Sequence, residues 1–346
     1  MTHIYGLTLE ELEGVLVKWQ EKKFHARQIF SWIYKKKADG FAAMSDLSAP
    51  LRTKLKENFY LSSIKLSCRQ KSRDGTEKLL LELKDATSIE AVIIPQENRV
   101  TGCVSTQVGC KFACSFCASG MRSFRRNLSS AEIVEEVLQL RKYAPENKLT
   151  HIVFMGTGEP LDNYENVLKA VRIINSPEAL RIASRRITIS TAGIIPGIKR
   201  LAEEGLQIEL SISLHSADDK MRSHIMPINK KYPLKELMAA CKDYIAKTGR
   251  QVTFEYILIK GINSSLQDAV ALCKILKGLR LCKVNLIPAN TVRELSIQAP
   301  NKLEILFFKD ALLKQGINVT LRKERGEDIQ AACGQLRLRY EKAHSS

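Results

Sequence analysis

Three cysteines, Cys110, Cys114 and Cys117, stand close together in the run GCKFACSFC. A [4Fe-4S] cubane usually takes four cysteine ligands, one for each iron, so three cysteines leave one iron open to coordinate another group. The alternative is a structural zinc site, but such sites are closed by four ligands that usually come as two spaced pairs. The loop contains no histidine, and the chain has no second CxxC. The spacing therefore favours an iron–sulfur cluster with an open iron.

The aromatic Phe116, which precedes the last of these cysteines, makes the loop similar to that of radical S-adenosylmethionine enzymes. The resemblance implies that the amino and carboxylate groups of S-adenosylmethionine bind the open iron of a [4Fe-4S] cluster. One electron then cleaves the sulfonium to a 5′-deoxyadenosyl radical. Because no regular disulfide ladder is visible, we interpret four other cysteines as small core residues: Cys68, Cys241, Cys273 and Cys282.

The chain is strongly basic, with 54 Lys and Arg against 37 Asp and Glu and a net charge of +17. Ordinary solubility charge is one interpretation, but the excess favours a polyanionic partner, with nucleic acid as the leading candidate. Basic residues lie beside aromatic ones in residues 19–37, which suits phosphates together with stacked bases. Other basic residues cluster at Arg122, Arg125, Arg126, Arg337 and Arg339.

The N-terminus gives no indication of export. Its first residues carry Glu10, Glu11 and Glu13 where a signal peptide needs a basic start and an apolar run. No uncharged stretch approaches the ~20 apolar residues of a membrane helix. We therefore expect a cytoplasmic protein without a membrane partner.

From about residue 96 onward, strand-like apolar segments alternate with helical ones. This alternation implies a parallel sheet with right-handed crossovers, and six repeats predict an incomplete barrel. The expected strands are CVSTQ, HIVFMG, RITIST, QIELSISL, VTFEYILIK and LCKVNLIP, with INVTLR as the last, and the expected helices span residues 129–143, 163–175, 194–204, 234–247, 266–277 and 302–315.

The first 95 residues follow other patterns. Thr8 and Glu11 form a capping box before apolar residues at helical spacing, and further helices are expected at 26–36 and 47–60. KLLLEL and SIEAVIIP alternate like strands on either side of a polar turn. We therefore predict an α/β chain with four parts: a helical RNA-binding domain at 1–62, a β-hairpin extension at 63–95, an incomplete (βα)6 radical S-adenosylmethionine barrel at 96–328 and a C-terminal segment at 329–346.

Polar and glycine-rich motifs fall at the carboxyl ends of the expected barrel strands, where chemistry gathers in parallel β/α barrels. The glycines of residues 156–160 would let the backbone approach a ligand, and Glu159 offers an acceptor for the ammonium of S-adenosylmethionine. Taken singly, each motif is equally consistent with a tight turn, a helix cap or a buried core histidine. The residues expected to bind S-adenosylmethionine are Gly158, Glu159, Ser190, Ser213, Leu214, His215 and Asn290.

Two further cysteines narrow the family. Cys103 lies seven residues before Cys110, and Cys333 lies beyond the last expected strand. With the runs MPINKKYP and NLIPAN, they make nearly the whole chain closely similar to the RlmN and Cfr family of radical S-adenosylmethionine adenine methyltransferases. From composition alone, the two cysteines are also consistent with small buried residues. The chain departs from the family pattern at Thr157, Ser119, Ser123 and Phe124.

The family resemblance implies a reaction that uses two S-adenosylmethionine molecules per turnover. Cys333 takes a methyl group from the first, and the second supplies a radical that abstracts hydrogen from the methylated Cys333. The resulting carbon radical adds to C2 of adenine, which is electron-poor and cannot attack a sulfonium methyl directly. After an electron is lost, Glu90 removes the C2 proton. Cys103 then attacks the Cys333 sulfur, which leaves a disulfide for a reductant to reopen. Without the resemblance, Glu90 is equally consistent with an outward-facing strand residue.

The resemblance also implies the partners. The RNA partners are 23S ribosomal RNA, methylated at adenosine 2503, and certain transfer RNAs, methylated at adenosine 37. An electron donor such as flavodoxin is also expected, and the enzyme is expected to act as a monomer. Two alternatives stay open. One is C8 methylation of the same ribosomal adenosine, as in Cfr, because both chemistries use the same residues. The other is a non-catalytic RNA-binding protein that uses the cluster structurally or as a redox sensor.

Overall fold

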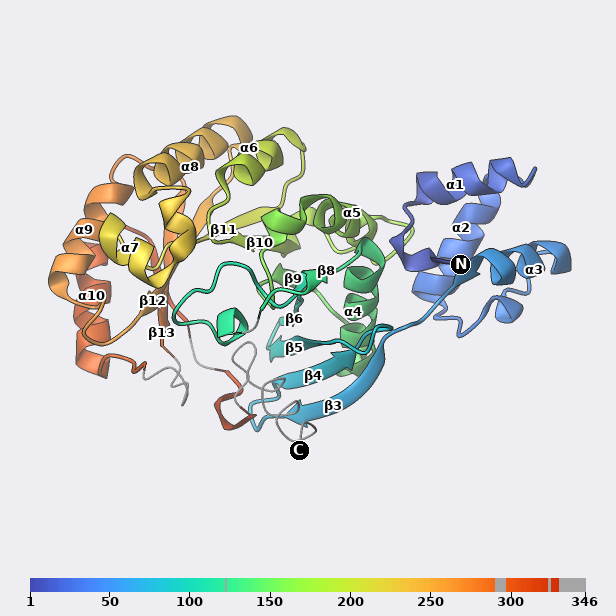
Figure 1. Ribbon diagram of the computed structural model, residues 1–346, viewed down its shortest axis with the longest axis horizontal. Helices are drawn as coiled ribbons and strands as arrows, with labels where there is room; N and C mark the ends of the chain where they lie inside the picture. The colour runs from blue at the N-terminus through green and yellow to red at the C-terminus, as the bar shows by residue number, and fades with distance from the viewer. Residues whose placement is uncertain (122, 290–296, 323–324, 330–346) are drawn as a thin grey trace.

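The structure is a computed structural model, and it describes residues 1–121, 123–289, 297–322 and 325–329 (Figure 1). Five residues singled out from the sequence lie outside the described residues: Arg122, Asn290, Cys333, Arg337 and Arg339. Within the described part of the chain, no helix combines the length and the apolar character needed to cross a membrane.

One ten-stranded sheet organises most of the chain, in the order β14-β13-β12-β11-β10-β9-β6-β5-β4-β3. From β6 to β14 neighbouring strands are parallel and follow one another in chain order, so each crossover returns to the next position along the sheet. This winding is that of an incomplete barrel, as predicted. The parallel strands are β6 (Arg99–Cys103), β9 (His151–Phe154), β10 (Ile187–Thr191), β11 (Glu209–Ser213), β12 (Val252–Leu258), β13 (Cys282–Pro288) and β14 (Val319–Leu321).

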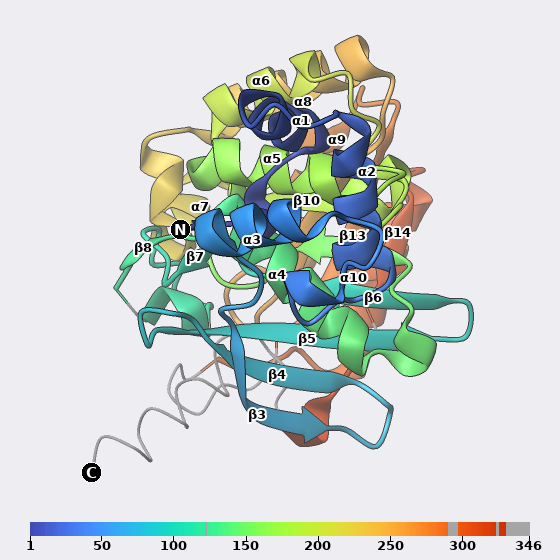
Figure 2. The ribbon, with the colours of Figure 1, turned by 90° about the vertical axis from the view of Figure 1, so that its right-hand side faces the viewer.

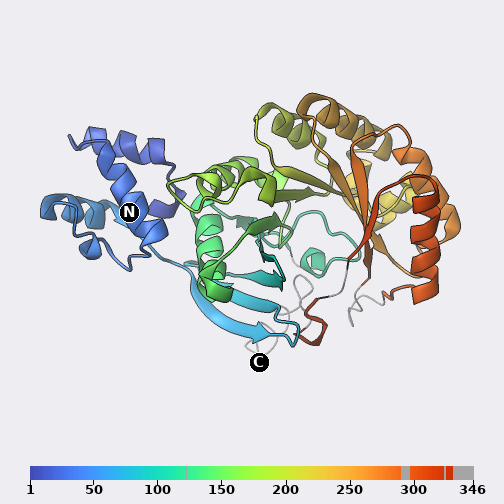
Figure 3. The ribbon, with the colours of Figure 1, turned by 180° about the vertical axis from the view of Figure 1, so that it is seen from behind.

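Helices cover the convex face of the parallel strands, as Figures 1 and 3 show. The strand residues that face them are apolar and fully buried, for example Ile189, Leu210, Phe254 and Val284, because one face of each strand packs against a helix. The helices are α4 (Ser130–Tyr143), α5 (Tyr164–Asn175), α6 (Ile195–Glu203), α7 (Asp219–Ile225), α8 (Leu234–Thr248), α9 (Leu266–Leu276) and α10 (Lys302–Lys314).

The extension before the barrel is larger than the expected hairpin. Three antiparallel strands, β3 (Lys65–Lys71), β4 (Glu77–Glu82) and β5 (Ser88–Gln96), continue the same sheet because β5 also pairs with β6 (Figure 2). The first barrel strand differs from the prediction as well. It ends at Cys103 instead of spanning CVSTQ, because the backbone beyond Val104 leaves the sheet.

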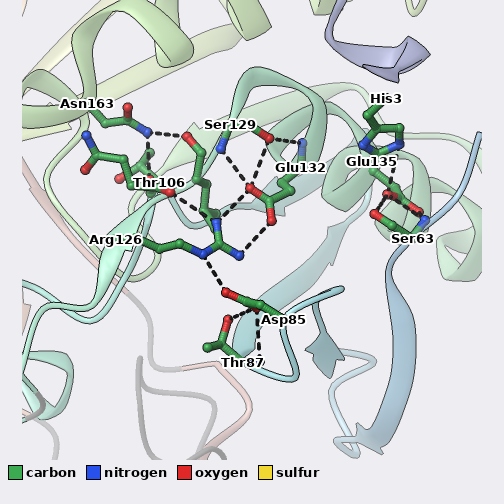
Figure 4. Close-up of polar contacts among 12 residues, drawn as sticks. His3, Ser63, Asp85, Thr87, Thr106, Arg126, Ser129, Glu132, Glu135 and Asn163 are labelled. Carbon is green, nitrogen blue, oxygen red and sulfur yellow. Dashed lines mark hydrogen bonds and ion pairs between the residues drawn. The ribbon is translucent and has the colours of Figure 1, made fainter. Parts of the chain in front are cut away.

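The N-terminal helices form a separate lobe beside the barrel (Figure 1). They are α1 (Leu9–Lys18), α2 (Phe24–Phe30), which continues as a π-helical turn over Ser31–Lys35, and α3 (Ala49–Asn58), and β1 (Thr2–His3) pairs with β2 (Phe59–Tyr60). The predicted capping box of Thr8 and Glu11 is confirmed. The lobe is fixed to the barrel through Glu135 of α4, whose carboxylate accepts hydrogen bonds from Ser62, Ser63 and the backbone of Ile64 (Figure 4).

Candidate active site

The segment with three cysteines, residues 109–121, is called the cysteine loop. It begins after β7 (Gln107–Val108), which pairs with β8 (Arg126–Asn127) and so closes the base of the loop. Gly109 has a φ of +80°, and a Cβ atom there would lie 2.3 Å from the Ser123 carbonyl oxygen. Only glycine fits this crossing of two backbones, so the sequence GC fixes the entry into the loop.

The thiols of the cysteine loop lie near one another. Burial, together with repulsion from Cys117, raises the pKa of Cys110 to about 11. Burial is also the main cause that raises the pKa of Cys114, and the charges of Cys117 and Cys110 raise it as well. A bound cation would lower these pKa values and hold the cysteines as thiolates.

The donor set of the cysteine loop is that of a cluster. In a cubane each thiolate binds a different iron, so the three ligands surround a larger body. The spacing and electrostatics of Cys110, Cys114 and Cys117 therefore fit a [4Fe-4S] cluster.

The run MPINKKYP, noted in the sequence, holds the cysteine loop from one side. It follows α7 and begins the short helix η8 (Pro227–Lys230). Ile225 accepts a hydrogen bond from the Ser115 amide at 3.0 Å. Ile225, Met226 and Ile228 also form a small apolar cluster, separate from the main core, against which Phe112, Cys114 and Phe116 pack. This run is thus a support for the loop.

Arg222 on α7 was not identified from the sequence, although its side chain is fully buried. It donates from Nε to the Leu214 carbonyl, from Nη2 to the carbonyls of Ala192 and Ser213, and from Nη1 to Asn229. Burial lowers its pKa to about 10, so it stays charged at neutral pH. The guanidinium therefore ties the ends of β10 and β11 to the segment that supports the cysteine loop. The available sequence signal was weak: Arg222 lies three residues before Ile225, so the two share one face of α7.

Glu159, expected to receive an ammonium group, lies fully buried in the turn after β9. Its carboxylate accepts hydrogen bonds from the amides of Ala192 at 2.7 Å and Leu161 at 3.0 Å. Burial raises its pKa to about 7 despite these bonds. Gly158 has a φ of +107°, and a Cβ atom there would lie 2.6 Å from the Gln107 side chain. The approach of Gln107 on β7 thus requires a glycine here, and the role of Gly158 in ligand binding stays a prediction.

His215, which follows β11, has a left-handed backbone with a φ of 59°. Its Nδ1 accepts the Ile257 amide hydrogen at 3.0 Å, so in the neutral ring Nε2 carries the proton. Burial and the charge of Arg222 lower its pKa to about 3, which keeps it neutral. The imidazole ring packs edge-on against the Phe116 ring of the cysteine loop, with 4.6 Å between the ring centroids. The left-handed backbone of this buried histidine is thus held by its tertiary contacts.

The concave face of the parallel strands is polar. Ser190 pairs with Ser211 across β10 and β11, and Ser213 pairs with Glu255 across β11 and β12, so these side chains share one face. Glu255 is buried, burial raises its pKa, and it accepts a hydrogen bond from Asn285 at 2.7 Å. The structure therefore places the predicted Ser190 and Ser213 in a polar row on the inner face, while Leu214 is fully buried just beyond it.

Glu90 and Cys103 lie on neighbouring strands of the sheet. Cys103 pairs with Val92 across β6 and β5, and Glu90 is two residues before Val92, so both side chains point to the same face. Both are buried, and Glu90 forms an ion pair of 2.8 Å with Lys78, a residue that was not identified from the sequence. Lys78 is the first residue of KLLLEL, where a single lysine resembles an ordinary surface position.

The last described residues contact the turn between β3 and β4. Asp328 accepts a hydrogen bond from the Ser72 hydroxyl and one from the Arg73 amide at 3.1 Å, and Asp74 accepts one from the Gly326 amide at 3.1 Å. The chain is therefore attached to the extension five residues before Cys333, which itself lies outside the described residues.

Comparisons with known proteins agree with this arrangement. Residues 104–273 match the family described as the Radical SAM superfamily, and residues 2–61 match the family described as the ribosomal RNA large subunit methyltransferase N-terminal domain. A protein of Thermoanaerobacter sp. (strain X514), named probable dual-specificity RNA methyltransferase RlmN, is 48% identical over 341 residues, which are 98% of this chain and 99% of that protein. A protein of the same name from Geobacillus kaustophilus (strain HTA426) is 47% identical over 98% of this chain and 93% of its own length.

A solved structure shows the same fold throughout. The crystal structure of a radical SAM methyltransferase from Sphaerobacter thermophilus superposes with a TM-score of 0.92 at 43% identity and covers 97% of this chain and 99% of its own. Membership of the radical SAM superfamily brings a [4Fe-4S] cluster and S-adenosylmethionine as cofactors. The chain belongs to the RlmN family of radical S-adenosylmethionine methyltransferases.

Proposed function

We propose that this enzyme methylates C2 of adenosine 2503 in 23S ribosomal RNA and of adenosine 37 in transfer RNAs. Its relatives are named dual-specificity RNA methyltransferases and match it over nearly their whole length. The single observation that carries the proposal is the placement of Glu90 and Cys103 on one face of the sheet, next to the strand end from which the chain continues to the cysteine loop. A proton acceptor and a resolving thiol side by side are what an enzyme–RNA adduct needs for its release.

Each group of residues has one task in this proposal. Cys110, Cys114 and Cys117 would hold the cluster, and the residues at the strand ends would bind S-adenosylmethionine: Gly158, Glu159, Ser190, Ser213, Leu214, His215 and Asn290. When bound, one S-adenosylmethionine would supply the methyl group, and a second would supply the radical with an electron from the cluster. Cys333 carries the methyl group as a thioether, and Glu90 takes the C2 proton from the adduct. The Cys103 thiolate attacks the Cys333 sulfur, and the bond from that sulfur to the methylene carbon breaks. The carbon keeps the electron pair and takes a proton to become the methyl group, and the resulting disulfide awaits two electrons and two protons from a reductant.

RNA would contact the basic surfaces. A cavity of about 350 Å³ lies between the N-terminal lobe and the barrel, lined among others by Tyr60, Lys84 and Arg126. Lys84 lies over the Tyr60 ring at 4.6 Å. Arg126 is paired with Asp85 and Glu132, which also line the cavity, so the cation on the Tyr60 ring is the group that suits RNA phosphates and bases. We propose that the N-terminal lobe, residues 1–62, grips the RNA while the target adenine unstacks, at a cost of a few kcal/mol. A flavodoxin-like donor, a monomeric state and a cytoplasmic location stay predictions.

The Cys103→Ala variant tests the proposal. Without the resolving thiol, the variant should accumulate protein covalently attached to RNA, seen as a slowly migrating band on a denaturing gel after anaerobic incubation with S-adenosylmethionine and reductant. Cys68→Ala, which changes a half-buried cysteine on β3, is the matched control and should give no such band. Absence of the band from Cys103→Ala would contradict the resolving role.

Two further measurements separate the alternatives. Nucleoside analysis of RNA from the wild-type reaction should show 2-methyladenosine, whereas 8-methyladenosine would establish C8 chemistry. A protein that uses its cluster only for structure should release no 5′-deoxyadenosine under reducing, oxygen-free conditions. Mass spectrometry of purified enzyme should show one methyl group on Cys333.

A further inference from the structure

Lys78 and Glu90 form a charged pair in a place where neither is expected. Their side chains are 0% and 4% exposed, and Lys78 Nζ lies 2.8 Å from Glu90 Oε2. Burying two charges costs several kcal/mol for each, and an apolar pair of similar size usually stabilises a sheet equally well or better. A retained buried pair therefore points to a task other than stability.

The position of the pair in the sheet indicates that task. Lys78 is paired with Val92, and Val92 is paired with Cys103, so the three residues form one row across β4, β5 and β6. Residues paired in this way show their side chains on the same face, and Glu90 joins them because it is two residues from Val92. Lysine, glutamate and cysteine thus share one small area of the sheet.

This face is distinct from the one that makes the core. Leu79, Leu81, Ile89 and Ala91, which alternate with the charged residues, are fully buried members of the main hydrophobic core. Lys78, Glu90 and Cys103 are buried on the opposite face and do not belong to that core. The charges therefore lie on the side of the extension that carries the proposed chemistry.

We infer that Lys78 is a positioning residue for Glu90, an inference that rests on the proposed function. The ammonium group holds the carboxylate through Oε2 and supplies the countercharge that an ionised base needs in a buried site. When Glu90 takes the C2 proton, the C–H electron pair stays in the adenine ring and the carboxylate becomes a neutral acid. Lys78 orients the base and exchanges no proton with the substrate.

The Lys78→Met variant tests this role in the full-length, cluster-loaded enzyme. It keeps the length of the side chain and removes the charge. Methylation of Cys333 should proceed as in the wild type, whereas release of RNA should slow by about 10²-fold, the scale of a lost general base. Covalent enzyme–RNA adduct should therefore accumulate although Cys103 is intact. A residue needed only for folding would not cause this accumulation.

Matched variants make the result specific. Lys71→Met on β3 removes an exposed lysine that also pairs with a glutamate, Glu77, at 3.5 Å, and it should behave as the wild type. Glu90→Gln should accumulate the adduct, and the double variant Lys78→Met with Glu90→Gln should be no slower than Glu90→Gln alone, because the two residues act as one unit.

Two outcomes would overturn the inference. One is a Lys78→Met enzyme that releases RNA at the wild-type rate. The other is a Lys78→Met enzyme that loses turnover without accumulating adduct while Cys333 is still methylated. Failure of the proposed function has a different signature, since in that case Cys103→Ala and Glu90→Gln would form no adduct either.

Discussion

The barrel mouth and the antiparallel extension bury charged side chains by two different means. At the mouth, main-chain groups compensate the charge: Glu159 accepts two backbone amides, and Arg222 donates to three backbone carbonyls. In the extension, side chains compensate each other, as Lys78 and Glu90 do at 2.8 Å. A main-chain partner is present whenever the fold is present. A side-chain partner depends on a second residue being of one particular type.

This difference separates scaffold from chemistry. Charges compensated by the backbone hold strand ends and loops in place, so they support the pocket whatever its occupant does. A charge compensated by another side chain can change its protonation state and still keep a partner nearby, which is useful for a residue that accepts a proton. We therefore expect substitutions at the mouth to act mainly on stability and ligand binding, and substitutions in the extension to act mainly on turnover.

The largest effect on stability is expected for Arg222→Met. The variant removes the donors for the carbonyls of Ala192, Ser213 and Leu214 and for Asn229, and each buried acceptor left unpaired costs about 1–3 kcal/mol. Loss of the buried charge offsets part of this cost, so the free energy of unfolding should fall by about 3–5 kcal/mol. Denaturant unfolding followed by circular dichroism measures it.

The control for this change is Arg200→Met on α6. Its guanidinium is mostly exposed and pairs with the exposed Glu165, so solvent screens the pair and the free energy of unfolding should hardly change. Equal losses of unfolding free energy in Arg222→Met and Arg200→Met would show that the hydrogen bonds from Arg222 to the main chain contribute little to stability. The proposed difference between the barrel mouth and the extension would then be contradicted.

Glu159→Gln should have the second largest effect. The amide can offer only one oxygen, so one of the two amides that now donate to the carboxylate, those of Leu161 and Ala192, must face an NH2 group. We expect a loss of about 1–3 kcal/mol in the free energy of unfolding and weaker binding of S-adenosylmethionine. Calorimetric titration measures the binding.

Glu165→Gln is the control for Glu159→Gln, because the Glu165 side chain is 79% exposed, and it should change neither quantity. The negative charge of Glu159 is among the causes that raise the pKa of Cys110 and Cys114, so its removal does not oppose the thiolates and the cluster should still assemble. Unchanged affinity for S-adenosylmethionine in Glu159→Gln would reject its assignment as a ligand residue and leave it a purely structural acceptor.

The sequence predicted the parts of this fold that depend on local patterns. Apolar periodicity gave the alternation of strands and helices, and the Thr8–Glu11 capping box formed as expected because both partners lie within one turn. The spacing of Cys110, Cys114 and Cys117 indicated a shared loop for the same reason. Each of these features needs only neighbours in the chain.

Features that depend on the register between distant segments could not be predicted. Lys78 looked like a surface lysine because its partner Glu90 is set by the pairing of β4 with β5. Arg222 looked ordinary because its acceptors come from the ends of two other strands. The close approach of Gly158 to Gln107 was not visible in the sequence, and its approach to a ligand stays a prediction. In each case tertiary contacts, not local propensity, give the residue its role.

The pH dependence of stability offers a third test at the barrel mouth. The pKa of His215 is lowered to about 3 by burial, while an unfolded histidine titrates near 6.5. Between these values the unfolded state binds more protons, so stability is full above pH 6.5 and falls as the pH drops toward 3. The slope from this residue is at most about 1.4 kcal/mol per pH unit.

His215→Asn isolates this contribution, because asparagine tolerates the left-handed backbone at this position. The difference in unfolding free energy between wild type and variant should shrink as the pH falls from 6.5 to 4.5, since all other groups are common to both. His224→Asn, at an exposed position on α7, should keep the slope of the wild type. A pH-independent difference would mean that the folded protein accepts a charge on His215.

The smallest effect is expected for Asp85→Asn, in the turn between β4 and β5. Asp85 accepts a hydrogen bond from Arg126 at 2.7 Å, and Arg126 also bonds Glu132 of α4 (Figure 4). The hydrogen bond from Arg126 is the main cause that lowers the pKa of Asp85. The pair therefore stabilises the fold at pH values above the usual pKa of aspartate, and this stabilisation is lost on acidification. Asparagine keeps an oxygen for the Thr87 amide.

Because the side chains of Asp85 and Arg126 are 43% and 33% exposed, the loss should be only about 0.5–1 kcal/mol and should disappear in about 1 M salt. Turnover should stay at the wild-type level. Both pairs include a carboxylate of the extension, but Lys78–Glu90 is buried within it, whereas Arg126–Asp85 is partly exposed and joins it to β8. The opposite outcome is an Asp85→Asn variant that impairs RNA release as strongly as Lys78→Met does. In that case any ion pair that stabilises the extension would support turnover, and the buried Lys78–Glu90 pair would have no specific role in the proton transfer.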